Sequence, residues 1–124
     1  MNKPLSSYRE LGVWRDGIAL VKACYLITQR FPKDELFGLT SQIRRSAVSV
    51  PANIAEGYGR GSRRDYVRHL MIAQGSLKEL ETHPIIAAEV DCGPKTDIEP
   101  ILTRCDQLGR GLGALIRSLR AKDD

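Results

Sequence analysis

Apolar side chains recur at steps of three and four residues in four separate stretches of the chain. This spacing places them along one side of an α-helix. It predicts helices over about residues 8–30, 35–56, 63–91 and 97–120. Alternation with a period of two, the mark of a half-buried strand, extends over no more than a few positions, so the chain is predicted to be all-α.

The helix boundaries are predicted from proline, glycine and capping residues. Ser62 followed by Asp65, and Thr96 followed by Glu99, have the spacing of N-terminal caps. The glycine-rich run 57–62 predicts a turn. Pro51 and Pro84 fall inside predicted helices, where a kink or a break is expected. The first helix is expected to face the core with Leu11, Trp14, Ile18, Val21, Tyr25 and Thr28.

Four amphipathic helices with short connections bury their apolar sides most economically as an up-down-up-down antiparallel bundle. The 124 residues suit one domain with one core, covering residues 1–124. Small residues also line a second side of the second and third predicted helices: Ser46, Ser49, Ala52, Ala55, Ala73, Gly75 and Ser76. They permit close helix contact either inside the bundle or between subunits, and the sequence leaves both interpretations open.

Composition excludes several classes of protein. Apolar residues make up 42% of the chain and charged residues 27%, and no apolar run approaches the roughly 18 residues of a membrane span. The first eight residues hold no hydrophobic export segment, so the cytoplasm is the expected location. Cys24, Cys92 and Cys105 lack the spacing of a disulfide framework or a zinc site and are expected to be reduced thiols in or near the core.

The charge is unevenly distributed. Six arginines lie close together in the sequence, with only Glu56 and Asp65 as acids between them: Arg44, Arg45, Arg60, Arg63, Arg64 and Arg68. Residues 79–106, in contrast, hold seven acids and two cations. The arginines are predicted to form a surface for a polyanion such as RNA or DNA, bound through phosphates. The alternative is a solvated surface on which salt bridges occupy the arginines.

Three polar residues fall on or near the apolar side of the second helix: Gln42, Asn53 and Glu56. Buried polar groups need partners, so these residues are predicted to form a structural network that fixes helix register. His69 and His83 lie fourteen residues apart, without the spacing of metal ligands. The sequence therefore predicts no catalytic residues, no metal and no cofactor, and the protein is not expected to be an enzyme. Tyr58 is expected to be exposed in the turn, where it could stack on a base.

Three segments of the sequence also resemble a known family. They are Phe31-Pro32, the run from Leu39 through Gln42-Ile43-Arg44-Arg45-Ser46-Ala47 to Asn53-Ile54-Ala55-Glu56-Gly57, and Ala73-Gln74-Gly75-Ser76-Leu77 with Glu79-Leu80. Together they resemble the bacterial four-helix-bundle family of 23S rRNA intervening-sequence proteins, over about residues 8–120. That family is similar in fold to the accessory variability proteins of diversity-generating retroelements, which are homopentamers with a basic, nucleic-acid-binding surface. The resemblance implies a homo-oligomer, most plausibly a pentamer.

Two hypotheses about function follow. The favoured one is a noncatalytic homo-oligomer with a basic surface that binds nucleic acid or acts as a scaffold. The alternative is a protein–protein assembly module with no nucleic-acid ligand, in which acids such as Glu56 and Asp65 occupy the arginines.

Overall fold

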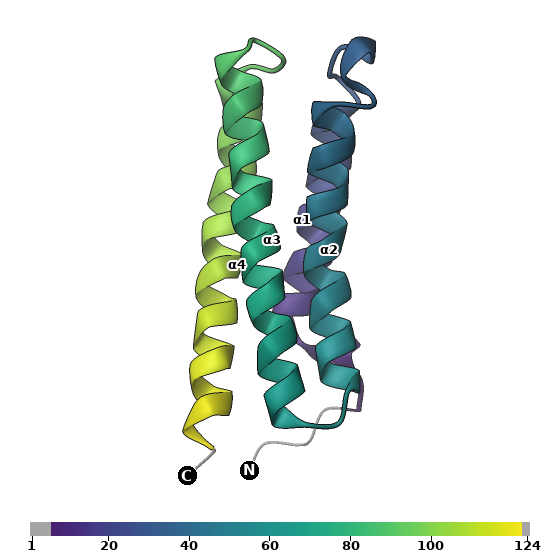
Figure 1. Ribbon diagram of the computed structural model, residues 1–124. Helices are drawn as coiled ribbons and strands as arrows, with labels where there is room; N and C mark the ends of the chain where they lie inside the picture. Colours follow the sequence, from purple (N-terminus) through teal and green to yellow (C-terminus); the bar gives the residue numbers. More distant parts are fainter. Residues whose placement is uncertain (1–5, 123–124) are drawn as a thin grey trace.

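The computed structural model describes residues 6–122 and consists of four long helices (Figure 1). Helix α1 spans Gly12–Thr28, α2 spans Leu39–Gly59, α3 spans Arg63–Glu89 and α4 spans Lys95–Ala121. Two single turns of 3-10 helix, η1 at Tyr8–Glu10 and η2 at Lys33–Glu35, precede α1 and α2. The predicted all-α class is confirmed for the described part of the chain.

The helices pack in sequence order as an antiparallel bundle, with α4 closing against α1. The start of α1, the α2–α3 turn and the end of α4 therefore meet at one end of the bundle, which we call the Ser62 end (Figure 1). The α1–α2 connection and the α3–α4 turn form the opposite end. There, Nη1 of Arg30, just after α1, lies 3.6 Å from Oδ2 of Asp97 at the start of α4.

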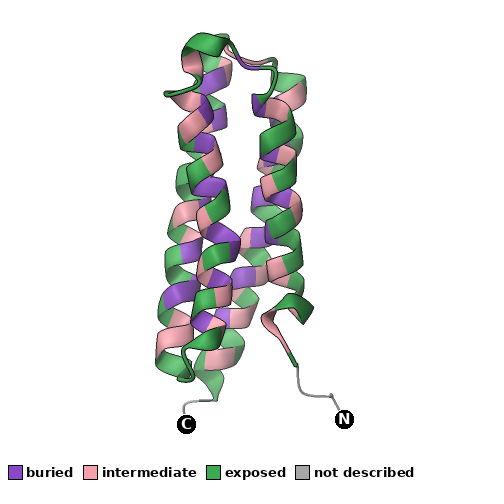
Figure 2. Cartoon of the chain, turned by 90° about the vertical axis from the view of Figure 1, so that its right-hand side faces the viewer, coloured by how far each residue is buried: buried purple, intermediate pink, exposed green. Residues whose placement is uncertain are grey.

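One apolar core runs along the bundle axis, with buried residues facing inward from all four helices (Figure 2). Helices α2, α3 and α4 supply most of it. Their fully buried members include Ile43, Val50 and Ile54 of α2, Leu70, Leu77 and Leu80 of α3, and Leu108 and Leu112 of α4. Burial of such side chains stabilises the fold by about 1.5–3 kcal/mol each.

The predicted core side of α1 is partly wrong. Gly17, Leu20, Cys24 and Thr28 are the buried residues of this helix, whereas Ile18 and Tyr25 are exposed. The physical reason is the close approach of α1 to α2, because a Cβ atom added at Gly17 would lie 3.2 Å from Pro51 Cβ. Small residues occupy this contact, so Ile18 and Tyr25 are turned toward the outer edge of the α1–α2 pair, while Leu11, Trp14 and Val21 remain half-buried against the core.

Neither Pro51 nor Pro84 breaks its helix. Both are buried, and α2 and α3 continue on either side of them (Figure 1). The predicted cap at Ser62 is confirmed, since its Oγ accepts a hydrogen bond of 3.1 Å from the Asp65 amide. The predicted cap at Thr96 is wrong: α4 begins at Lys95, with Pro94 as N-cap, and Thr96 and Glu99 lie inside its first turns.

The predicted glycine turn is shorter than expected. Helix α2 continues through Gly57 and Gly59, and the chain reverses only over residues 60–62, where Gly61 has a φ of +81°. Gly57 serves packing, because a Cβ atom there would lie 2.7 Å from His69 Cβ. The end of α2 can therefore sit directly against the first turns of α3. Tyr58 is half-buried and meets Tyr66 edge to face at 5.9 Å, so it is not the open stacking platform expected from the turn.

Candidate nucleic-acid interface

Four of the six predicted arginines gather at the Ser62 end. Arg60 follows the last turn of α2, and Arg63, Arg64 and Arg68 lie in the first two turns of α3. All four are exposed. The N-terminus of α3 adds backbone N–H groups and the positive end of a helix dipole to this cationic segment.

Ion pairs occupy some of these arginines only loosely. Arg60 Nη2 lies 3.0 Å from Glu56 Oε2, and Arg68 Nε lies 3.9 Å from Asp65 Oδ1. Arg64 has no ion-pair partner among residues 6–122. Exposed pairs of this kind contribute about 0–1 kcal/mol. Their guanidinium groups can therefore exchange a carboxylate for a phosphate at little cost.

Arg44 and Arg45 do not belong to this cluster. They lie one α2 length away from Arg60, a rise of about 24 Å along the helix. Arg44 is held in place, because its guanidinium lies 4.5 Å from the Tyr25 ring centroid and its Nε donates to Thr28 Oγ1 at 2.9 Å. Arg45 is exposed on the outer surface of α2. The six arginines thus form two separate groups.

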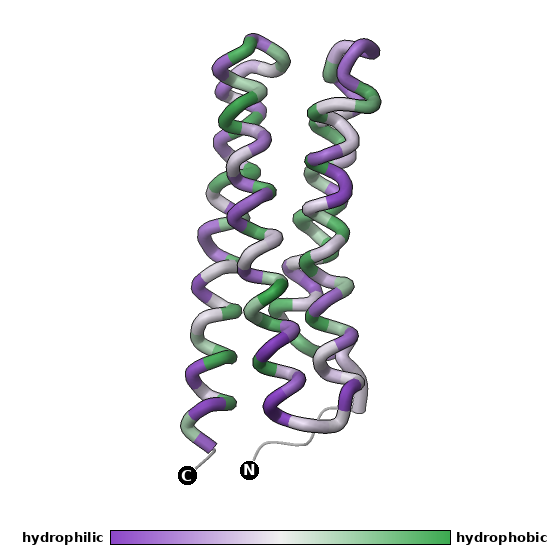
Figure 3. Tube along the Cα trace, in the orientation of Figure 1, coloured by the Kyte–Doolittle hydropathy of each residue, from purple (hydrophilic) through white to green (hydrophobic). Residues whose placement is uncertain are grey.

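The fold brings a second set of cations to the Ser62 end that the sequence analysis missed. Helix α4 runs antiparallel to α3, and Arg120 Nη2 donates to Met71 Sδ at 3.2 Å. The last turns of α4 therefore lie beside the first turns of α3, and in both segments hydrophilic and hydrophobic residues alternate (Figure 3). The exposed cations that the end of α4 contributes are Arg117, Arg120 and Lys122. The antiparallel topology predicted from sequence would have been sufficient to place them here.

The bundle is consequently polarised in charge. The segments that meet at the Ser62 end, residues 6–18, 56–70 and 111–122, hold nine cations and four acids. The acidic stretch 79–106 folds into the last half of α3 and the first half of α4, toward the opposite end. Separation of this kind raises the local potential at the Ser62 end well above what the net charge of +4 implies.

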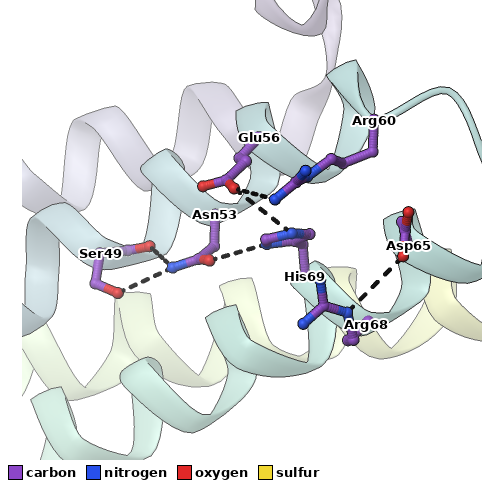
Figure 4. A network of polar contacts seen from close by, with 7 residues as sticks. All are labelled: Ser49, Asn53, Glu56, Arg60, Asp65, Arg68 and His69. Carbon is purple, nitrogen blue, oxygen red and sulfur yellow. Dashed lines mark hydrogen bonds and ion pairs between the residues drawn. The ribbon is translucent and has the colours of Figure 1, made fainter.

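A polar network connects α2 and α3 next to the arginines (Figure 4). Ser49 Oγ and Ser76 Oγ are 2.8 Å apart, and the Asn53 amide nitrogen donates to Ser49 O at 2.8 Å and Ser49 Oγ at 3.1 Å. Asn53 Oδ1 then faces His69 Nδ1 at 3.2 Å. Because an amide oxygen only accepts, His69 donates from Nδ1.

Glu56 completes the network from the solvent side. Its Oε2 lies 3.7 Å from His69 Nε2 and 3.0 Å from Arg60 Nη2. His69 is buried, and its Nε2 has no hydrogen-bond partner among the described residues. In the sequence, His69 stands out only as a possible metal ligand, and its spacing does not predict its place between Asn53 and Glu56. The network links the α2–α3 packing directly to the arginine at the turn.

Gln42 is not part of the network. It is exposed and three turns away from Asn53. The hydrogen bonds that it makes are those of its main chain, whose oxygen accepts from Ser46 Oγ at 2.7 Å and whose nitrogen donates to Gly38 O at 3.0 Å. Among the small residues, Ser46 and Ala73 are buried and Ser49 bonds to Ser76 within the chain, so these four serve packing inside the bundle. Ala52 and Gly75 remain exposed.

The described residues include no cluster of three or more histidine, cysteine, aspartate or glutamate side chains that could hold a metal ion. Burial raises the pKa of both Cys24 and Cys105 to about 12, so these thiols stay protonated at neutral pH. Cys105 lines an open hollow of about 450 Å³ between α3 and α4, together with Lys78 and Asp106. A protonated thiol gives this hollow no nucleophile at neutral pH.

Comparison with known proteins places the chain in a family. The model of the 23S rRNA-intervening sequence protein family matches residues 9–114. The chain belongs to this family. Its fold is similar to the crystal structure of a protein of unknown function from the S23 ribosomal protein family of Bacteroides thetaiotaomicron, with a TM-score of 0.78 and 22% identity over 84% of this chain and 97% of that one. No curated protein matches the chain.

The family assignment confirms the resemblance seen in the sequence and agrees with the four-helix fold. Within residues 6–122, no helix combines the length and apolar character needed to cross a bilayer.

Proposed function

We propose that this member of the 23S rRNA-intervening sequence protein family is a noncatalytic homo-oligomer, most plausibly of five subunits, that binds RNA or DNA through phosphates at its Ser62 end. The observation that supports the proposal is the convergence of exposed cations from two helices: Arg63, Arg64 and Arg68 of α3 and Arg117, Arg120 and Lys122 of α4. Oligomerisation in a common orientation multiplies this charge and places several phosphate contacts within reach of one strand.

Binding at this surface is sequence-independent. The cations lie on the ends of helices, without a protruding recognition element that would enter a groove, and contacts to phosphates carry no direct sequence information. Counterion release then dominates the affinity, which falls log-linearly as salt rises.

The test is a titration of the wild type and an Arg63→Ala/Arg64→Ala/Arg68→Ala variant with unrelated RNA and DNA oligonucleotides at several salt concentrations. Light scattering first establishes that both have the same oligomeric mass. The wild type is expected to bind with a steep salt dependence, and the variant's slope should be flatter by about one unit for each phosphate that it no longer neutralises. No binding at low salt, or an unchanged slope, contradicts nucleic-acid binding.

The second candidate is a protein–protein assembly module in which carboxylates occupy the arginines. The ion pairs Glu56–Arg60 and Asp65–Arg68 favour it. It predicts an oligomer of the same mass that binds no oligonucleotide at any salt concentration. The titration therefore separates the two candidates.

A further inference from the structure

Two bulky side chains that α1 turns away from the core contribute to an apolar surface on the outer edge of the α1–α2 pair. Ile18 and Tyr25 are seven residues apart on one side of α1 and are 44% and 40% exposed. Val48 of α2 is 44% exposed and lines a hollow of about 340 Å³ with Tyr25, Arg44, Arg45 and Ser49. We call this the basic hollow.

The α1 and α2 sides of the basic hollow carry positive charge only, and the nearest acid is Glu79 of α3, which lines an adjoining hollow with Arg45 and Ser49. Across the helical residues 17–28 and 39–55 there are three cations, Lys22, Arg44 and Arg45, and no acid. A partner for this surface must therefore offer apolar side chains among carboxylates.

A second hollow of about 220 Å³ lies on the outer edge of the α3–α4 pair. Its apolar side chains are Ile85 and Ala88 of α3 and Ile98 and Leu102 of α4, with Ile85 48% exposed. Glu89, Glu99 and Lys95 complete its lining, within the stretch 79–106 that holds seven acids and two cations. We call this the acidic hollow. It has the chemistry that the basic hollow requires, and the same chain carries both.

The two hollows lie on opposite edges of the bundle and at different heights along it. The helices pack in the cyclic order α1, α2, α3, α4, so the α1–α2 and α3–α4 edges face away from each other (Figure 1). The basic hollow is the nearer of the two to the Ser62 end. Its Ser49 is level with Ser76 of α3, because their Oγ atoms are 2.8 Å apart, whereas the acidic hollow begins at Ile85, nine residues or about 14 Å further along α3. Both hollows are therefore in the half of the bundle away from the Ser62 end.

We propose that the basic hollow of one subunit packs against the acidic hollow of a second copy of this chain. The contact is heterologous: each subunit uses two different surfaces, and repetition with a constant turn closes a ring. Because the two surfaces differ in height along the bundle, the ring closes when each bundle is tilted against the ring axis. Rotational symmetry then points every Ser62 end to the same side of the ring. The inference rests on the homo-oligomer of the proposed function and identifies its interface.

The test exchanges charges at exposed positions that carry no core side chain. Lys22→Glu/Arg45→Glu makes the basic hollow acidic, and Glu89→Lys/Glu99→Lys makes the acidic hollow basic. Each double variant is expected to weaken self-association at least about tenfold, by like-charge repulsion, and to appear by light scattering as a 13.8 kDa monomer where the wild type is assembled. The quadruple variant, with both surfaces exchanged, should assemble again.

The matched control is Arg117→Glu/Lys122→Glu, which changes the net charge equally but lies at the Ser62 end. It should assemble like the wild type, and circular dichroism should show the same helical content for all variants. A monomeric wild type overturns both the oligomer and this interface. An assembled wild type whose double variants also assemble overturns the interface alone. If both double variants dissociate and the quadruple variant does not assemble again, the pairing of the two hollows is overturned.

Discussion

Asn53 and His69 show how one hydrogen bond joins two helices. The Asn53 amide is oriented by two bonds to Ser49, which leaves its oxygen for the His69 ring at 3.2 Å. His69 is buried, so it has no water to replace this partner. Removing either residue therefore destabilises the fold, mainly because the other is left with an unsatisfied buried polar group.

Asn53→Ala is expected to lower the free energy of unfolding by about 1–3 kcal/mol, because it leaves the buried His69 nitrogen without a partner. Urea denaturation measures the change. Gln42→Ala, on the exposed side of the same helix, should change the stability by less than about 0.5 kcal/mol. In a double-mutant cycle with His69→Ala, a coupling energy near zero would show that the bond does not stabilise the fold.

The buried thiols make the free energy of unfolding depend on pH in the alkaline range. Burial raises the pKa of Cys24 and Cys105 from the ordinary value of 9.0 to about 12. Between these values the unfolded chain loses the thiol protons while the folded chain keeps them, so the free energy of unfolding falls as pH rises from about 9 to 12. Below about 9 both states are protonated and this dependence disappears.

The measurement is urea denaturation of the wild type and a Cys24→Ala/Cys105→Ala variant at pH 8 and pH 11. The variant should lose less stability between the two pH values than the wild type, because the remaining tyrosines and lysines titrate equally in both. Equal losses would show that the two thiols ionise alike in the folded and unfolded chains.

At the scale of the helix, glycine has opposite effects in α2 and α3. Gly57→Ala places a Cβ atom 2.7 Å from His69 Cβ and is expected to destabilise the fold by about 1–3 kcal/mol through overpacking. Gly75→Ala, in an exposed part of α3 with no atom within 4 Å, should stabilise it by about 0.5–1 kcal/mol. Thermal unfolding of the two variants should move the midpoint in opposite directions, and a common direction would contradict the close contact at Gly57.

The pattern of apolar residues was sufficient to predict four helices, their antiparallel order and the core sides of α2, α3 and α4. It was not sufficient for α1, where Gly17 and Cys24 face the core instead of Ile18 and Tyr25. Hydrophobic spacing predicts that the side of α1 with the bulkier residues faces the core. Which side does so depends on how closely α2 approaches α1. That distance is a property of the pair of helices, which a pattern within one helix does not record.

The candidate site was predicted in part for a similar reason. Arg60, Arg63, Arg64 and Arg68 are close in sequence and remain close in the fold. Arg44 and Arg45 are separated from them by the length of α2, and Arg117, Arg120 and Lys122 join them from the far end of the chain. Counting charges along the sequence therefore groups Arg44 and Arg45 with the cluster and leaves out the cations of α4. The reason is that residues far apart along one helix are also far apart in space, whereas the ends of antiparallel helices meet.

At the scale of the molecule, the cations of α4 should contribute to nucleic-acid binding as much as those of α3. Arg117→Ala/Arg120→Ala/Lys122→Ala is expected to flatten the salt dependence by about one unit for each phosphate left without a cation. The control, Arg30→Ala/Lys33→Ala/Arg104→Ala, removes three cations from the opposite half and should leave the slope unchanged. Equal effects of the two triple variants would mean that binding is not confined to the Ser62 end.

The position of Cys92 has a practical consequence. It is the half-exposed cysteine of the α3–α4 turn, whereas Ser6 and Lys122 both lie at the Ser62 end (Figure 1). A purification tag or fluorophore fused to either terminus therefore starts within a few residues of the candidate interface and competes with its ligand. A maleimide dye on Cys92 sits a full bundle length away, and since Cys24 and Cys105 are buried, it can be attached to the native protein without other changes.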